Sequence, residues 1–381
     1  MADTAAHLVV RVFPEVPVRQ WVLTLPYTLR FRMAYDSCLV SEVHHIFVQT
    51  VFGSLRRRAG KGKKLKCGAV TFIQRFGDAL NANVHYHLLA IDGVYTLDEK
   101  GDVCFHPVAP PSDKEVARVA ERIARRIERL MIRRGMTEKD EEFGNEQPLL
   151  AELYNASVSG RVATGPKAGR PLIKVGDDVD LEGLGFIAGP RCASVAGVNV
   201  HADVCISGHD RIRLERLFRY ASRPPVATDR LSELPDGRLL YRLKRRWRDG
   251  TTKVIYEPLE FMEKLAALVP PPRFNLVRYS GVLASSSSLR RRIIPAKPAN
   301  IVDEFPACKH SKKPSLSVDT SNTHSDLHER RYAWAELLKR VYSLDALKCD
   351  RCGGKMRILC AIHPPDAIEK ILLSSLCLVM V

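Results

Sequence analysis

The sequence predicts an α+β fold whose strands form an antiparallel sheet. Three segments rich in β-forming residues, Arg19–Leu25, Val70–Phe76 and Val84–Ile91, are typical of strands. Asp92-Gly93 follows the third segment, and Asp-Gly between apolar residues is the usual signal for a tight hairpin turn. Longer segments with helical periodicity lie between and after these strands.

Two long helices are predicted in the first half of the sequence. Phe31 to Gly53 is typical of a mixed apolar helix that ends where a basic loop begins. Ser112 and Glu115 form a capping-box pattern that starts a second, basic helix. Its apolar residues recur at helical spacing: Val116, Val119, Ile123, Ile127 and Leu130. The arginine-rich face of this helix suits contact with phosphates, although a solvated face is the commoner outcome.

The second half of the sequence predicts a helix with a tyrosine at its end. Residues 138–190 are acidic and then rich in Gly and Pro, which indicates an irregular insertion. Val198–Ile206 is typical of a strand, and Asp210–Tyr220 of a helix that a Pro-Pro pair stops. Tyr220 is therefore expected in the last turn of that helix.

Composition divides the 381 residues into five segments. Residues 1–137 and 191–295 are expected to form the two parts of one domain, separated by the insertion. Residues 296–330 are polar, contain Pro and Ser, and are typical of a linker. Residues 331–381 are expected to form a small tail that contains a Cys-x-x-Cys pattern.

The chain is strongly basic, with 59 Lys and Arg against 43 Asp and Glu and a formal net charge of +16. Such a charge attracts polyanions, so nucleic acid is the first partner to consider. The cations are clustered between residues 56 and 66 and between residues 242 and 248, where Tyr241 and Trp247 are interleaved. Either cluster also fits a solvated loop. The residues predicted to contact DNA in these clusters are Arg56, Arg57, Arg58, Lys63, Lys64, Arg245 and Arg246.

The cysteine pattern and the absence of a long apolar run indicate a cytoplasmic protein. Ten cysteines at irregular spacing, without a signal peptide, are typical of reduced thiols rather than a disulfide framework. No apolar run has the length of a bilayer span, so no membrane contact is expected.

His85 and His87 are candidates for a metal site. Side chains two apart in a strand project from the same face, and two neutral imidazoles can share one divalent ion while leaving positions open for phosphate oxygens. From this spacing alone, packing is the commoner role. Gln74 is a candidate third ligand because it shares strand parity with an otherwise apolar face, and His201 is a second candidate. Hydrogen bonding is the commoner role of either side chain.

Four runs in this order carry a family resemblance: Val18–Pro26, Gln74–Leu88 with its His-Tyr-His, Leu214–Pro225 with its Arg-Tyr-Ala-Ser-Arg-Pro-Pro, and Leu276–Gly281. Together they resemble the rolling-circle transposases of the insertion-sequence family numbered ninety-one. That family belongs to the nuclease superfamily named for its His-hydrophobic-His (HUH) motif. The resemblance extends from about Ala2 to the end of the chain, and it implies a central antiparallel sheet with flanking helices.

The resemblance also implies a chemistry. His85 and His87 match the metal-binding pair, with Mg²⁺ or Mn²⁺ as the ion, and Tyr220 matches a nucleophilic tyrosine. The implied reaction nicks and rejoins single-stranded DNA at element ends through a 5′-phosphotyrosine link. Arg219 and Arg223 are expected to stabilise the developing negative charge. The expected setting is bacterial and nucleoid-associated.

The sequence departs from the family pattern at three points. The positions four residues from Tyr220 are Arg216 and Pro224, so this chain resembles a single-tyrosine branch. The cysteine-rich zinc-binding domain that usually precedes the segment starting at Met1 is missing from this sequence, and Ser280 stands where the family has a histidine. The alternative function is therefore a catalytically impaired remnant that binds element ends. A third, weaker hypothesis is a metal-dependent hydrolase that uses water as the nucleophile.

Cys349 and Cys352 form a knuckle-like pattern in the tail that suits structural zinc. Zinc needs four ligands, and Cys360 and His363 are the candidates for the other two. Reduced surface cysteines are the alternative interpretation.

Overall fold

The computed structural model describes residues 2–60, 65–136, 148–176, 189–247, 249–270, 272–294, 334–349 and 352–356. The chain forms two compact units that divide between Pro306 and Ala307. Lys63, Lys64, the predicted linker and the end of the tail lie outside the described residues. None of the helices in the described ranges is both long and apolar enough to cross a membrane.

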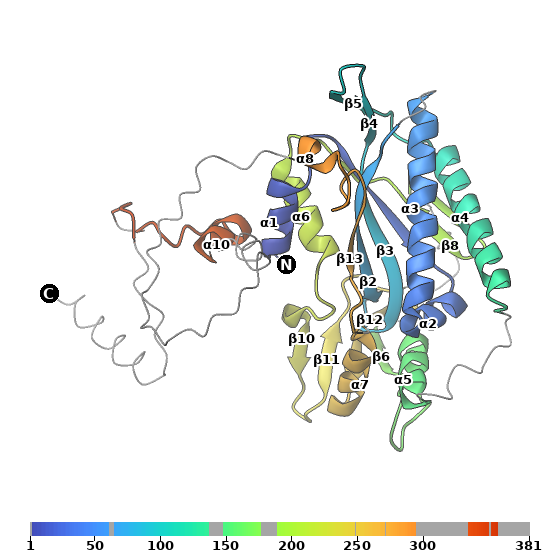
Figure 1. Ribbon diagram of the computed structural model, residues 1–381. Coiled ribbons are helices and arrows are strands. Elements are labelled where there is room, and N and C mark those ends of the chain that lie inside the picture. Colours follow the sequence, from blue (N-terminus) through green and yellow to red (C-terminus); the bar gives the residue numbers. More distant parts are fainter. Residues whose placement is uncertain are drawn as a thin grey trace, which may run out of the picture. The chain divides into compact units, whose positions relative to one another are not determined.

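The first unit is built on a seven-stranded antiparallel sheet (Figure 1). Its strands are β1 (Val18–Thr24), β2 (Gly68–Phe76), β3 (Ala82–Ile91), β7 (Cys192–Val195), β8 (Val198–His201), β9 (Cys205–Ile206) and β13 (Val277–Gly281). The order across the sheet is β13-β2-β3-β1-β8-β7, and β9 also pairs with β1. Helices flank this sheet, which confirms the predicted α+β class with a central antiparallel sheet.

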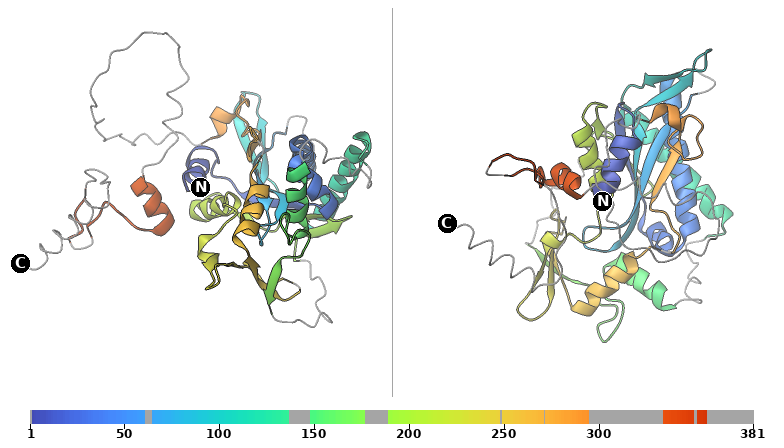
Figure 2. Two further views of the ribbon diagram at one scale, coloured as in Figure 1. Left: turned by 90° about the horizontal axis from the view of Figure 1, so that it is seen from below. Right: turned by 60° about the vertical axis from the view of Figure 1, so that its left-hand side comes forward.

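Helices cover both faces of the sheet (Figures 1 and 2). On one face, α2 (Tyr27–Tyr35), α3 (Ser37–Ala59) and α4 (Asp113–Arg133) pack on the residues of one strand parity, such as Trp21 and Tyr86. On the other face, α1 (Ala2–Arg11), α6 (Arg211–Ala221) and α8 (Arg290–Ile293) pack on the alternate residues, such as Phe72 and Leu89. The period of two in the strands thus supplies two separate hydrophobic clusters.

A second, four-stranded sheet packs against the end of β2 and the start of β3. Its order is β10-β11-β12-β6. The strands are β6 (Ile173–Gly176), β10 (Leu231–Glu233), β11 (Leu239–Arg242) and β12 (Thr251–Tyr256), accompanied by η1 (Thr228–Arg230), α5 (Pro148–Ser159) and α7 (Pro258–Leu268). Phe76 and Ala82 share a buried cluster with Tyr241 and Tyr256 of this sheet.

The prediction of an irregular insertion is wrong for residues 148–176, which contain α5 and β6. The strand β6 completes the second sheet by pairing with β12, and α5 packs against α7. The acidic and Gly-rich flanks dominated the composition of residues 138–190 and obscured the apolar helix between them. Residues 138–147 and 177–188 of the predicted insertion lie outside the described residues.

The predicted hairpin turn at Asp92-Gly93 is also wrong. The chain continues from β3 into β4 (Gly93–Leu97), which pairs with β5 (Val103–Pro107), so the hairpin closes at residues 98–102 instead. Asp92 is buried and forms an ion pair with Arg19, whose Nε and Nη2 donate to Asp92 Oδ2 at 2.8 and 2.7 Å. A Cβ at Gly93 would lie 2.4 Å from the ring of Phe105, so close packing explains this glycine.

The predicted helix Phe31–Gly53 is two helices, because Asp36 ends α2 and caps α3. The Asp36 carboxylate accepts a hydrogen bond from the backbone N–H of Leu39 at 2.8 Å. The helix α3 then runs past Gly53 to Ala59, so Arg56 and its two neighbours lie on a helix rather than in a loop.

The second unit contains α10 (Trp334–Tyr342) and a short turn around Cys349 and Cys352. Gly353 donates its backbone N–H to the Cys349 carbonyl at 2.8 Å, and Cys349 donates to the Gly354 carbonyl at 2.9 Å. Cys360 and His363 lie outside the described residues, so the zinc site stays a prediction.

Candidate functional site: a histidine pair beside a helix-borne tyrosine

His85 and His87 lie side by side on the face of β3 that α6 covers. Their ring centroids are 5.0 Å apart, and both side chains are buried. Burial lowers the pKa of His85 to about 4 and the pKa of His87 well below its ordinary value. Both imidazoles are therefore neutral at pH 7, which is the protonation state that binds a metal ion.

Hydrogen bonds fix the orientation of both rings. His85 Nδ1–H donates to the Asn83 carbonyl at 2.8 Å, which leaves the lone pair of Nε2 available. The side-chain amide of Gln20 lies 2.9 Å from His87 Nδ1. Either the nitrogen or the oxygen of the Gln20 amide can face the ring. When the oxygen faces it, the oxygen accepts a hydrogen bond from His87 Nδ1–H. His87 Nε2 is buried and, among the described residues, has no hydrogen-bond partner.

Gln74 faces His85 directly across the β2–β3 ladder. Its Nε2 donates to the Ala221 carbonyl at 2.7 Å and lies 3.4 Å from the Tyr220 carbonyl, so this amide ties the end of α6 to the sheet. Its Oε1 is buried and finds no hydrogen-bond partner in the described parts of the chain. A buried acceptor without a partner is costly, so Gln74 Oε1 is available to a ligand.

His201 lies in the same cross-strand row as His87, but not beside it. Val22 of β1 pairs with His87 on one side and with His201 on the other, so two strand spacings separate the histidines. Two spacings are about 10 Å, too far for one ion to join both rings. Within the described ranges, no group of three or more His, Cys, Asp or Glu side chains is arranged to hold a metal ion. The Gln74 amide oxygen, opposite His85 on β2, is the candidate that the structure brings beside the histidine pair.

Tyr220 lies in the last turn of α6 with its side chain 40% exposed. Its ring centroid is 6.0 Å from that of His87, and the two rings are nearly perpendicular at 89°. Two cations lie over the tyrosine ring: the Arg223 guanidinium carbon at 4.9 Å and the Lys244 ammonium at 4.5 Å from its centroid. The phenol therefore combines solvent access with two positive charges beside the histidine pair.

The position of Tyr220 follows from how α6 is anchored. Asp210 caps the start of the helix by accepting the backbone N–H of Arg213 at 3.0 Å. Leu214 and Phe218 bury one side of α6, and the Phe218 ring packs 4.9 Å from that of Phe13. These contacts turn the opposite side of the last turn, and with it Tyr220, toward solvent.

The predicted DNA-contacting arginines near the tyrosine remain close to it. Arg223 lies 3.9 Å from the Asp78 carboxylate and stacks on Tyr220, and Arg219 precedes Tyr220 on α6. Arg245 and Arg246 are exposed in the loop that follows β11, next to Lys244. Lys244 is thus the residue of the second basic cluster that the structure places at the tyrosine.

The first basic cluster lies elsewhere. Arg56, Arg57 and Arg58 end α3, on the opposite face of the sheet from α6. Arg56 donates to the Leu65 carbonyl at 3.1 Å, Arg58 donates to the Ala109 carbonyl, and Arg57 lies 3.7 Å from the Glu115 carboxylate. The structure therefore does not bring these arginines to the histidine pair.

Sequence reasoning missed Gln20 and Asn83, and it did not place Lys244 at the tyrosine. Gln20 carries the same signal as Gln74, a polar side chain at an inward position of an otherwise apolar strand. The Asn83 contact uses a backbone carbonyl, which has no sequence signal. Ser280 pairs with Ala69 in the β13–β2 ladder, at the sheet edge beyond β2.

Comparison with known proteins supplies the family. Residues 68–291 match a family model whose description reads "Putative transposase". The match covers more than half of the chain and contains the histidine pair, Gln74, Tyr220 and Lys244. No curated protein and no solved structure matches the chain. The chain therefore belongs to this transposase family, and DNA is its partner.

Proposed function

We propose that this transposase nicks and rejoins single-stranded DNA at element ends, with Tyr220 as the nucleophile. The observation that carries the proposal is the position of the half-exposed Tyr220 ring, 6.0 Å from the ring of His87 and under two cations. A nucleophile beside a pair of buried neutral imidazoles suits metal-assisted phosphoryl transfer.

The donor set fits a divalent ion such as Mg²⁺ or Mn²⁺. His85 and His87 would hold it through their Nε2 atoms, and Gln74 through the Oε1 atom that lacks a partner in the described structure. Three protein ligands leave positions open for phosphate oxygens. When bound, the ion would polarise the scissile phosphate and stabilise its added negative charge. Structural zinc at Cys349 and Cys352 is proposed separately, as a stabiliser of the second unit.

The chain's own groups supply the remaining chemistry. Tyr220 Oη attacks the phosphorus and releases its proton to solvent. The new P–Oη bond joins the protein to the new 5′ end of the downstream strand, while the P–O3′ bond breaks and the leaving oxygen takes up a proton. Arg223 and Lys244 lie close enough to offset the negative charge on the phenolic oxygen and the phosphate. The ester retains the bond energy, so attack by a 3′-hydroxyl on it rejoins strands without ATP.

A labelled oligonucleotide tests this function. The protein is incubated with Mg²⁺ or Mn²⁺ and single-stranded DNA that carries the element's ends, and products are resolved under denaturing conditions. A 3′-end label should migrate with the protein, and a 5′-end label should appear in a shortened free fragment. Label released as free DNA from both ends would indicate a hydrolase. Tight binding without any adduct would indicate the impaired, DNA-binding remnant.

Tyr220→Phe should abolish the adduct and leave DNA binding within about twofold, because only the hydroxyl is lost. Tyr279→Phe is the matched control, because Tyr279 is partly buried on β13. This variant is expected to form the Tyr220 adduct as the wild type does. An adduct that persists in Tyr220→Phe would assign the nucleophile to another residue.

A further inference from the structure

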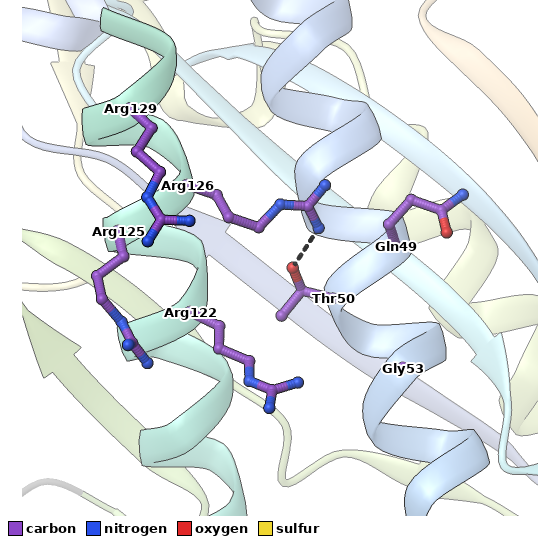
Figure 3. A pocket seen from close by; sticks show the side chains of 7 residues that line it. All are labelled: Gln49, Thr50, Gly53, Arg122, Arg125, Arg126 and Arg129. Atoms are coloured by element: carbon purple, nitrogen blue, oxygen red, sulfur yellow. Dashed lines mark hydrogen bonds between the residues drawn. The ribbon is translucent and has the colours of Figure 1, made fainter. Parts of the chain in front are cut away.

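A groove lined by arginines lies between α3 and α4, on the face of the sheet opposite to Tyr220 (Figure 3). Its volume is about 360 Å³. The lining residues are Gln49, Thr50 and Gly53 from α3 and Arg122, Arg125, Arg126 and Arg129 from α4. Figure 3 shows the side chains of Arg122 and Arg126 reaching from α4 toward α3.

The four arginines form one row because their spacing of three, four and three residues places them on one side of the helix. Arg126 Nη1 donates to Thr50 Oγ1 at 3.2 Å. In the described structure none of the four forms an ion pair with a carboxylate. Glu121 and Glu128 border the row on the same helix, four residues before and three residues after Arg125, but neither forms an ion pair with these arginines in the described structure. The groove therefore presents four guanidinium groups that have no ion-pair partner in the described structure.

Gly53 keeps the groove open from the α3 side. It lies inside a 23-residue helix, where glycine is less favourable than alanine. A Cβ built at Gly53 meets nothing within 4 Å, so no close packing in the described structure explains the missing side chain. An open wall opposite a row of guanidinium groups suits the close approach of a ligand.

The chemistry of the lining identifies the ligand class. Guanidinium groups bind phosphate oxygens, and Gln49 and Thr50 offer further polar contacts. The lining contains no aromatic ring, whereas sites for single-stranded DNA stack bases on aromatic rings. The row from Arg122 to Arg129 extends about 10 Å along α4, which matches about three successive phosphates of one strand in a duplex.

We infer that the α3–α4 groove binds the sugar-phosphate backbone of double-stranded DNA without reading its sequence. The family already makes DNA the partner of this chain. The inference does not rest on the proposed cleavage chemistry, because the groove and Tyr220 lie on opposite faces of the sheet. Its role would be to hold the duplex next to the single strand that is processed.

Binding of a blunt duplex at several salt concentrations tests the inference. Arg125→Gln/Arg129→Gln should reduce the slope of log K against log salt by about 1.8, because each lost phosphate contact removes about 0.9. Lys100→Gln/Arg170→Gln is the matched control, since it removes the same charge from exposed positions outside the groove. An equal change of slope in both variants, or no change in the first, would overturn the inference.

Substitution at Gly53 tests it from the other wall. Gly53→Glu places a carboxylate opposite the arginines and should weaken duplex binding at least about tenfold, whereas Gly53→Ala should bind as wild type. Both variants should keep the thermal melting of the parent and form the Tyr220 adduct with single-stranded oligonucleotides. Duplex binding unaffected by Gly53→Glu would overturn the inference. So would a variant that keeps duplex binding and loses only the binding of single-stranded DNA or of an acidic polypeptide, each measured in parallel. Failure of adduct formation in the wild-type protein would count against the cleavage chemistry alone.

Discussion

At the scale of single residues, the site depends on atoms that the described structure leaves unused. His87 Nε2 and Gln74 Oε1 are both buried, and neither has a hydrogen-bond partner in the part of the chain that is described. His85 Nε2 faces away from the hydrogen bond that orients its ring. Burial of an unsatisfied polar atom costs about 1–3 kcal/mol, so these two atoms and His85 Nε2 are the groups on which the proposed ion site rests.

His85→Ala should abolish the metal dependence of the adduct together with the adduct itself, because one imidazole and one amide hold a divalent ion poorly. We expect binding of Mn²⁺, measured by calorimetry, to weaken by at least about 100-fold. His201→Ala is the control, since His201 lies two strands away and should bind Mn²⁺ as wild type does. Unchanged Mn²⁺ binding in His85→Ala would place the ion elsewhere.

At the scale of elements, caps and buried pairs decide where helices and strands end. Asp36 separates α2 from α3 because its carboxylate caps α3 and also pairs with Arg134 at the end of α4, at 2.5 Å. The same residue thus defines a helix boundary and joins two helices that pack on one face of the sheet.

Asp36→Ala should lower the free energy of unfolding by about 1–2 kcal/mol, because it removes both the cap and the ion pair. Asp36→Asn keeps the cap and loses the charge, so its loss should be smaller, at most about 1 kcal/mol. Urea unfolding followed by circular dichroism measures both values. Equal losses in the two variants would show that the cap contributes little.

At the scale of the whole molecule, three buried histidines connect folding to pH. Burial lowers the pKa of His44 and of His85 to about 4, and that of His87 well below its ordinary value. The ordinary value in an unfolded chain is about 6.5. Between these values the unfolded chain binds protons that the folded protein excludes, so stability is retained above pH 6.5 and falls as the pH drops toward 4.

The fold should therefore lose up to about 1.4 kcal/mol per pH unit for each of these histidines between pH 6 and pH 4.5. His44→Gln removes one of them outside the proposed metal site, where His44 Nε2 lies 2.9 Å from Thr71 Oγ1. Urea midpoints measured in EDTA at several pH values should depend less steeply on pH in this variant. Parallel pH profiles for the two proteins would contradict the expectation.

Local patterns in the sequence were sufficient to predict the sheet and the shared face of His85, His87 and Gln74, because alternation in a strand is a local property. The position of Lys244 was not predictable. It depends on the second sheet, where β6 from the supposed insertion pairs with β12. The predicted turn at Asp92-Gly93 was wrong for a similar reason. Asp92 pairs with Arg19, which is 73 residues away, and no local pattern in the sequence shows that pair.

The hydrogen bonds from Gln74 show that the carbonyl end of α6 points toward the histidine pair, and this orientation has an electrostatic consequence. The end of a helix where carbonyls are exposed carries the negative pole of the helix dipole, equivalent to about half an elementary charge. Tyr220 sits at this pole, which repels a phosphate and attracts a cation. In the proposed mechanism this pole would favour the ion at the histidines, and Arg223 and Lys244 would offset the repulsion between the pole and the DNA strand.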